Sequence, residues 1–215
     1  MSRSVKAELL DSLDPKDPDA IASRRDLRLI NRFMGNYTWF ESVFCPQCVA
    51  RNHCLEIGAG GGELAIRIIR KACCSTYTAI DLAPAPEDWP ESAFWHRGDL
   101  FQYPGYHTAE VLLANLVLHH FTDEQLTQIG KRISNSSIHK IVANEPCRRP
   151  AHKMQLRLGK LVGFNHVTLH DGCISIDAGF REDELPQRLG LDQKIWYWKI
   201  EETLMGAYRM VAERR

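Results

Sequence analysis

The chain has no surplus of either charge and no apolar run long enough to cross a membrane. Its 215 residues include 27 Lys plus Arg and 27 Asp plus Glu, so it lacks the long-range attraction that nucleic-acid-binding proteins normally use. The longest strongly apolar stretch, residues 111–118, is far shorter than the roughly 20 residues of a spanning helix. The N-terminus has acidic residues where a signal peptide has its apolar stretch. We therefore expect a cytoplasmic protein that binds neither nucleic acid nor a membrane.

The sequence also lacks the paired cysteine motifs of a zinc site. There are seven cysteines, an odd number without regular spacing, which favours reduced thiols in the absence of a signal peptide. Cys45 and Cys48 have CxxC spacing, and His53 and Cys54 follow, but no second CxxC supplies the remaining ligands. Cys54 also lies in an apolar run where its side chain would pack. These patterns favour structural cysteines, and we predict no metal.

No internal repeat, low-complexity tract or long linker divides the chain, whose length suits one domain. Short apolar runs alternate with helical patterns from Cys54 onward. The expected strands are residues 53–57, 76–80, 92–96, 110–115 and 138–144, with helices at 63–72 and 123–134 between them. This alternation predicts an α/β fold with a doubly wound parallel sheet covered by helices on both faces.

Two helix starts and one hairpin complete the expected architecture. Asp19 is placed to cap a helix over residues 20–34, which Gly35 would end. Thr122 and Gln125 have the spacing of a capping box at the start of helix 123–134. Near the C-terminus, two β-rich runs, 193–200 and 204–214, are split by 201–203 and predict an antiparallel hairpin.

A dense glycine turn follows the first expected strand. The stretch CLEIGAGGGELA, residues 54–65, has four glycines in five positions. A dinucleotide fingerprint that starts at Gly58 requires glycine at position 63, and Glu63 there would repel a pyrophosphate. A Walker loop requires Gly-Lys-Ser/Thr, which is absent. What remains is acidic-x-Gly-x-Gly-x-Gly, formed by Glu56, Gly58, Gly60 and Gly62.

Further polar residues follow the ends of the next three strands. Asp81 ends the second strand, nineteen positions after Gly62, where a carboxylate can bind both ribose hydroxyls of a nucleoside. NAD-dependent enzymes share this feature, so Asp81 alone does not distinguish between cofactors. Asp99, in Gly98-Asp99-Leu100, follows the third strand, and Asn115 ends the fourth.

These markers, in this order over residues 50–145, resemble the class I S-adenosylmethionine-dependent methyltransferases. The resemblance implies a Rossmann-like sheet of seven strands in the order 3-2-1-4-5-7-6, with the last strand antiparallel. It implies S-adenosyl-L-methionine as cofactor and an acidic residue at 99 that accepts a hydrogen bond from the adenine amino group. The cofactor-binding residues expected from it are Glu56, Gly58, Ala59, Gly60, Gly62, Asp81, Leu82, Asp99, Leu100 and Asn115.

A narrower likeness concerns the acceptor. The stretches RRDLRLINRFMGN, NLVLHHF and LHDGCISIDAGFREDEL are similar to bacterial small-molecule methyltransferases encoded beside type III polyketide synthases. This implies a phenolic or polyketide-like acceptor. We expect methylation at oxygen, but the sequence leaves open whether oxygen, nitrogen or carbon is methylated and whether the protein is a monomer or a homodimer. Residues 1–49 would form an N-terminal helical lid. Residues 50–215 would form the methyltransferase domain, with a substrate-cap insertion around 146–182.

A phenol has a pKa near ~10, so a neutral imidazole is a suitable base. His119 and His120 follow the fourth strand, and His170 precedes Asp171, which could orient it. The sequence leaves open which of the three histidines is catalytic and whether each only packs. Other functions also stay open: an RNA or protein methyltransferase, a degenerate binding subunit, or an NAD-linked enzyme, for which Glu63 is the main obstacle.

Overall fold

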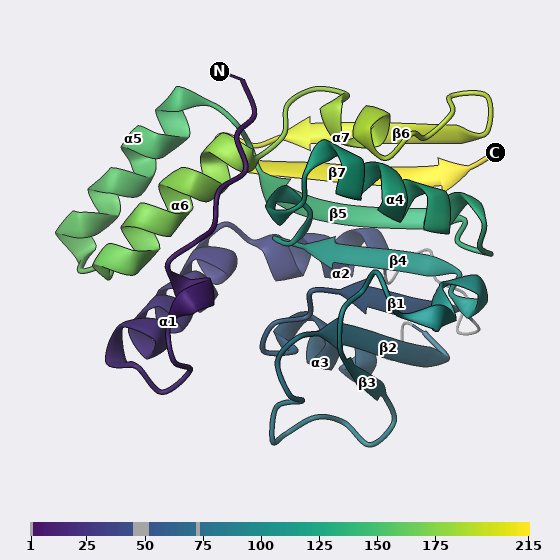
Figure 1. Cartoon of the computed structure of the whole chain (residues 1–215), viewed down its shortest axis with the longest axis horizontal. Coiled ribbons are helices and arrows are strands. Elements are labelled where there is room, and N and C mark those ends of the chain that lie inside the picture. Colours follow the sequence, from purple (N-terminus) through teal and green to yellow (C-terminus); the bar gives the residue numbers. More distant parts are fainter. Residues whose placement is uncertain (1, 45–51, 72–73) are drawn as a thin grey trace.

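A computed structural model describes residues 2–44, 52–71 and 74–215 of the chain. Its centre is one seven-stranded sheet with the order β3-β2-β1-β4-β5-β7-β6 (Figure 1). The five N-terminal strands pair in parallel, and β7 is antiparallel to both of its neighbours. The strands are β1 (His53–Ile57), β2 (Thr76–Asp81), β3 (Phe94–Arg97), β4 (Val111–Asn115), β5 (Lys140–Pro146), β6 (Trp196–Glu202) and β7 (Ala207–Arg214). The predicted fold class and strand order are confirmed.

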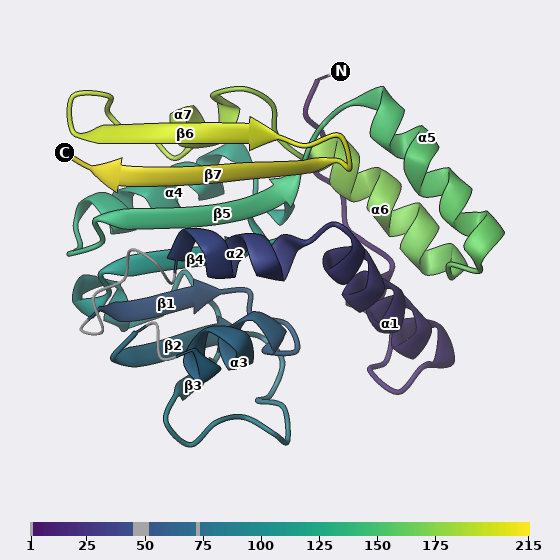
Figure 2. The same cartoon turned by 180° about the vertical axis from the view of Figure 1, so that it is seen from behind.

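Helices cover both faces of the sheet. Figure 1 shows α4 (Asp123–Ser134) and α7 (Glu184–Arg188) on one face, and Figure 2 shows α2 (Asn36–Phe44) and α3 (Glu63–Arg70) on the other. Each face has its own buried cluster. Leu55 and Ile57 of β1 belong to the α4 side, whereas Cys54 packs on the α2–α3 side. Burial on both faces explains the uninterrupted apolar run Val-Leu-Leu-Ala in β4.

Helix α4 begins at the predicted capping box. The side chain of Thr122 accepts a hydrogen bond from the Gln125 backbone N–H at 3.3 Å. The Gln125 side chain in turn accepts one from the Thr122 N–H at 2.9 Å. Two backbone donors at the helix start are therefore satisfied locally, and the sequence alone was enough to place this end.

The first long helix starts earlier than expected. Helix α1 spans Pro18–Phe33, and its cap is Asp17, whose carboxylate accepts the Asp19 N–H at 2.8 Å. The prediction of Asp19 as the cap was wrong because proline favours the first helical position and needs no donor there. Gly35, with φ +65°, ends this region as predicted, and α2 follows it directly.

The region expected to be a substrate-cap insertion consists largely of helices that the sequence patterns did not reveal. Its elements are α5 (Pro150–Leu158), the short 3-10 helix η4 (Gly159–Val162) and α6 (His166–Ala178). Helix α6 packs against α1, and both lie beyond the carboxyl ends of β1, β4 and β5 (Figure 1). The other 3-10 helices are η1 (Leu10–Ser12), η2 (Pro104–Thr108) and η3 (Leu118–His120).

Some element ends differ from the expectation. Strand β6 runs through Glu202, and the hairpin turn is residues 203–206 rather than 201–203, because Gly206 with φ +90° supplies the turn conformation. Strand β3 begins two residues later than expected. Cys45 and Cys48 lie outside the described residues. None of the helices described is long and apolar enough to cross a membrane.

Candidate active site

The glycine turn after β1 is a bare backbone surface. Gly58, Gly60 and Gly62 have φ values of +64°, +57° and +76°, a region that favours glycine. A Cβ on Gly58 would lie 2.3 Å from a methyl carbon of Val117, so the loop after β4 packs directly on this turn. A Cβ on Gly60 would meet no described atom within 4 Å. One side of the turn is therefore filled by protein and the other is open.

Asp81 at the end of β2 lies beside that open side. One carboxylate oxygen accepts the Gly60 N–H at 2.8 Å, and the other accepts the Ala83 N–H at 2.8 Å. Each carboxylate oxygen can accept a further hydrogen bond, so Asp81 can still bind the hydroxyls of a ligand. Leu82 is 74% exposed at the same strand end, so its side chain is free to contact a ligand.

Glu56 lies in β1, immediately before the turn, and is only 2% exposed. The Tyr77 hydroxyl donates a 2.6 Å hydrogen bond to it. Burial raises the pKa of Glu56 to about 8; the Tyr77 bond opposes this rise, and the charges of Glu63 and Asp81 add to it. No cation pairs with Glu56 among the described residues. A positively charged ligand group beside Glu56 would favour its ionised form and lower its pKa.

The end of β3 adjoins the end of β2. Asp81 pairs with Arg97 in the sheet, and the Gly98 N–H donates to the Asp81 carbonyl at 2.9 Å. Asp99 comes next, and its partly exposed carboxylate accepts the Phe101 N–H at 2.9 Å. Leu100 is buried in the core on the α4 side. The sequence-predicted carboxylates therefore lie near the carboxyl ends of three neighbouring strands. Glu56 is in β1, Asp81 is the last residue of β2, and Asp99 comes shortly after β3.

Asn115 at the end of β4 links the sheet to the N-terminal helix. Its side-chain oxygen accepts from the Asn144 amide at 2.9 Å, and its amide lies 3.5 Å from the Asn31 oxygen. Asn31, on α1, also accepts from Asn36 at 3.0 Å. This chain of amides fixes α1 over the end of β4. Asn144 was not identified from the sequence, since only its position at a strand end marks it.

Glu145, which sequence reasoning missed, shapes the loop after β4. Its carboxylate is fully buried and accepts the backbone N–H groups of Val117, Leu118 and His119 at 3.1, 2.9 and 3.2 Å. It also lies 2.7 Å from the His119 Nδ1. Leu116, just before, has φ +57°, a strained conformation for a branched residue. One carboxylate thus holds the loop that carries both predicted histidines.

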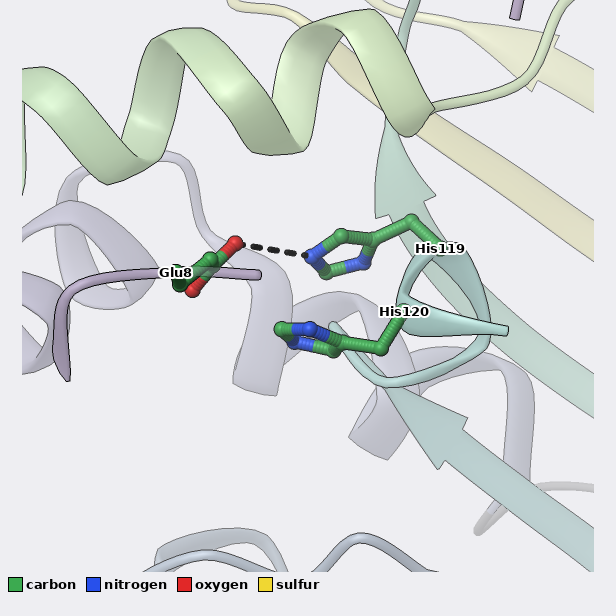
Figure 3. Close-up of side chains that lie close together, drawn as sticks. All are labelled: Glu8, His119 and His120. Carbon is green, nitrogen blue, oxygen red and sulfur yellow. Dashed lines mark ion pairs between the residues drawn. The ribbon is translucent and has the colours of Figure 1, made fainter. Parts of the chain in front are cut away.

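The two histidines differ in environment although they are adjacent (Figure 3). His119 is 3% exposed and lies between Glu145 and Glu8, whose Oε1 is 3.8 Å from the His119 Nε2. Burial would lower the pKa of His119, but the hydrogen bond with Glu145 and the nearby Glu8 carboxylate outweigh it and raise that pKa to about 9. The centroids of the His119 and His120 rings are 4.2 Å apart and their planes are tilted by 34°. Burial together with the His119 charge lowers the pKa of His120.

Glu8 reaches this site on an N-terminal segment, residues 2–12, that crosses from the histidine loop to α6. The Arg3 guanidinium donates to the carbonyls of His119 and Phe121 at 3.1 and 2.8 Å. The N–H groups of Leu9 and Leu10 donate to the two oxygens of Asp171, both at 2.9 Å. No local motif marks Glu8 as a site residue, because its role depends on contacts with residues more than 100 positions away.

His170 lies on α6, and its side chain is half-exposed. Its Nδ1 is 2.9 Å from Asp171, so the two adjacent residues do contact each other. No contact joins His170 to His119 or His120 in the part of the chain that the structure describes. The three predicted catalytic histidines therefore form a pair and a separate residue.

Glu8, His119 and His120 offer ligand atoms that all lie within 4.8 Å of one another. Imidazole and carboxylate are ordinary ligands of transition metals. However, Glu8 and Glu145 already balance the charge on His119. The arrangement is that of an ion pair beside a second imidazole, and the absence of a metal stays a prediction.

Comparisons with known proteins bear on the fold. No family model and no curated protein sequence matches the chain. Among solved structures, the plantazolicin methyltransferase BpumL, in complex with a triazolic desmethylPZN analog and SAH, has a TM-score of 0.73 and 12% identity over 96% of this chain and 93% of that one. The pyocyanin biosynthetic protein PhzM gives 0.64 and 16% over 97% and 62%. The methyltransferase domain of bacterial CtHen1-CN gives 0.53 and 12% over 86% and 98%.

At these identities the likeness concerns the fold. The seven-stranded order, the antiparallel β7 and the flanking helices are those of a Rossmann-like methyltransferase fold.

Proposed function

We propose that the protein is an S-adenosylmethionine-dependent methyltransferase whose acceptor is a small molecule, with methylation at the oxygen of a phenolic or polyketide-like compound. The observation that carries this proposal is the open glycine turn, which is bordered by Asp81 and by the buried Glu56. Among the described residues, no cation pairs with Glu56. That surface suits a cationic nucleoside without phosphate. The complexes of BpumL with SAH, on the same fold, support the same cofactor.

Each predicted cofactor residue has a place in this proposal. Asp81 would bind the ribose hydroxyls and Asp99 the adenine amino group, while Glu56 would face the ammonium group of the amino-acid part. Asn115, at the end of β4, would lie nearest the transferred methyl group. The backbone of Gly58, Ala59, Gly60 and Gly62 would adjoin the ligand, and the side chain of Leu82 would contact adenine. Leu100, whose side chain is buried in the core, would contribute only its backbone.

The reaction requires alignment and removal of one proton. When bound, S-adenosylmethionine supplies a methyl group already activated by the sulfonium, and the C–S bond breaks as the acceptor oxygen forms the new C–O bond. His120 takes the proton of the acceptor hydroxyl, because its lowered pKa keeps it neutral near pH 7. It then releases that proton to solvent. His119 cannot take it, since both of its ring nitrogens face carboxylates.

His170, oriented by Asp171, is the second candidate for the base. Its side chain is half-exposed on the helix that would cover the acceptor. Residues 1–49 are proposed as the lid and 146–182 as the cap. A direct contact supports this pairing: Asp26 of α1 accepts the Asn165 N–H at the start of α6 at 2.7 Å. The acceptor would enter when these elements separate.

Calorimetry with S-adenosylhomocysteine tests the cofactor assignment. We expect micromolar binding that Asp81→Ala abolishes, because the substitution removes the ribose contacts and the partner of the Gly60 N–H. Asp14→Ala, which removes an exposed carboxylate in an N-terminal turn, is the matched control and should bind normally. Tight binding of NADH without binding of S-adenosylhomocysteine would overturn the proposal.

A further inference from the structure

The N-terminal segment brings to the histidine pair a carboxylate that no strand supplies. Glu8 is mostly buried, and its Oε1 lies 3.8 Å from the His119 Nε2 (Figure 3). The Ser175 hydroxyl on α6 hydrogen-bonds to the same oxygen. The neighbouring N–H groups of Leu9 and Leu10 are fixed on Asp171. Glu8 is therefore held from two sides, and its position depends on the docking of residues 2–12 against α6.

His119 has a carboxylate at each ring nitrogen. Nδ1 is 2.7 Å from Glu145, and Nε2 faces Glu8. A neutral imidazole has one N–H and can donate to only one of them, whereas an imidazolium can donate to both. Two carboxylates also compensate a buried cation that would otherwise be costly. The geometry, a 2.7 Å hydrogen bond on one side and an ion-pair contact at 3.8 Å on the other, therefore favours the protonated form of His119.

Other charged groups surround the pair from each packed element. The N-terminal segment supplies Glu8 and Asp11, and β5 supplies Glu145. Helix α6 supplies Asp171, whose negative charge adds to the effect of burial in raising the pKa of Asp11. The only guanidinium bonded to this loop, among the residues described, is that of Arg3, which donates to the His119 carbonyl. The local balance therefore favours a positive charge on one imidazole, and the carboxylates at both nitrogens of His119 place it there.

We propose that Glu8 is a positioning residue that, together with Glu145, holds His119 as an imidazolium. The adjacent His120 then stays neutral and acts as the base. This inference rests on the proposed function. As an imidazolium, His119 has an N–H on each ring nitrogen and so ties the histidine loop both to Glu145 and to the N-terminal segment through Glu8. The N-terminal segment is then part of the catalytic site, which is complete only when that segment is docked.

The protonation states define a pH window. Burial opposes ionisation of Glu8, but its contacts with the histidines outweigh this and lower the pKa of Glu8. The pKa of His119 is raised to about 9, so its charge is present below that pH and is lost above it. The pKa of His120 is lowered, so it is neutral near pH 7. Methyl transfer should therefore decline above about pH 9.

Histidine-selective NMR titration of the protein with bound S-adenosylhomocysteine tests this without an acceptor. In the wild type we expect His119 to titrate near pH 9 and His120 below the ordinary value of 6.5. Glu8→Gln should increase the acid dissociation constant of His119 by about tenfold or more, which is one pKa unit. Asp14→Asn, an equal charge change on an exposed turn, should leave it unchanged. An unaltered His119 titration in Glu8→Gln would overturn the proposal.

Turnover supplies a second readout with any phenol that the wild type methylates. Glu8→Gln should reduce kcat at least ~10-fold and move the alkaline limb of the pH profile to lower pH, with KM for S-adenosylmethionine unchanged. Glu8→Asp, which keeps the charge, should recover part of kcat. Normal kcat in Glu8→Gln would refute the role of Glu8. Failure of the wild type to bind S-adenosylhomocysteine would refute the proposed function instead.

Discussion

Glu56→Gln should make the unliganded protein more stable at pH 8 and a poorer cofactor binder. Glu56 is 2% exposed, and its pKa is raised from 4.5 to about 8. Between these values the folded state keeps a proton that the unfolded state releases, so stability falls as pH rises from 4.5 towards 8. At about 1.36 kcal/mol per pKa unit, this cost approaches ~5 kcal/mol at pH 8, which is an upper bound.

The glutamine keeps the size of the side chain and can still bond to the Tyr77 hydroxyl, but it has no charge to bury. We expect urea unfolding to show little difference from the wild type at pH 5 and a gain of roughly 2–5 kcal/mol at pH 8. Glu87→Gln, which removes an exposed carboxylate, is the control and should show neither effect. An equal difference between Glu56→Gln and the wild type at pH 5 and pH 8 would refute the reasoning.

The same carboxyl should make cofactor affinity depend on pH. If the ligand's ammonium requires ionised Glu56, wild-type affinity for S-adenosylhomocysteine gains about tenfold from this group between pH 7 and pH 9. The ligand's own titration is common to both proteins, so the difference between wild type and Glu56→Gln isolates the contribution of Glu56. Parallel pH profiles, measured by calorimetry, would show that Glu56 does not face the bound ammonium.

Two further substitutions test the glycine turn and the N-terminal cap of α1. Gly58→Ala should lower stability by roughly 2–4 kcal/mol and abolish S-adenosylhomocysteine binding, because its Cβ would lie 2.3 Å from Val117 and φ is +64°; normal binding in calorimetry would contradict this. Asp17→Ala should lower the free energy of unfolding by about 1 kcal/mol through loss of the α1 cap, whereas Asp19→Ala should cost less. Equal losses in urea titrations would argue against Asp17 as the cap.

The sheet could be predicted because its signals are local. The apolar run 111–114 is continuous because β4 is buried on both faces. The capping box at Thr122 spans four residues and needs no tertiary information. Helix α6 was missed because it has buried residues on several sides, among them Val167, Asp171 and Ile176, and so shows no single apolar face.

The proposed cofactor half of the candidate site could likewise be predicted from local signals, whereas the proposed acceptor half could not. The cofactor half is formed by residues at or just after the ends of strands, such as Asp81 at the end of β2 and Asn115 at the end of β4, so strand prediction also locates them. The acceptor half depends on Glu145, which reaches His119 from β5, and on Glu8, which reaches it because the N-terminal segment crosses to the histidine loop. Such long-range pairs leave no periodic trace in one sequence.

The proposed acceptor half of the site is tied less firmly to the core than the proposed cofactor half. The sheet edge and glycine turn are fixed by core packing, as the contact of Gly58 with Val117 shows. The segment that carries Glu8 is held by hydrogen bonds to His119 and Asp171 and contributes little to the sheet core. Residues 2–12 can therefore change with less cost to the fold than the turn can. Acceptor preference should accordingly depend more on this segment and α6 than on the strands.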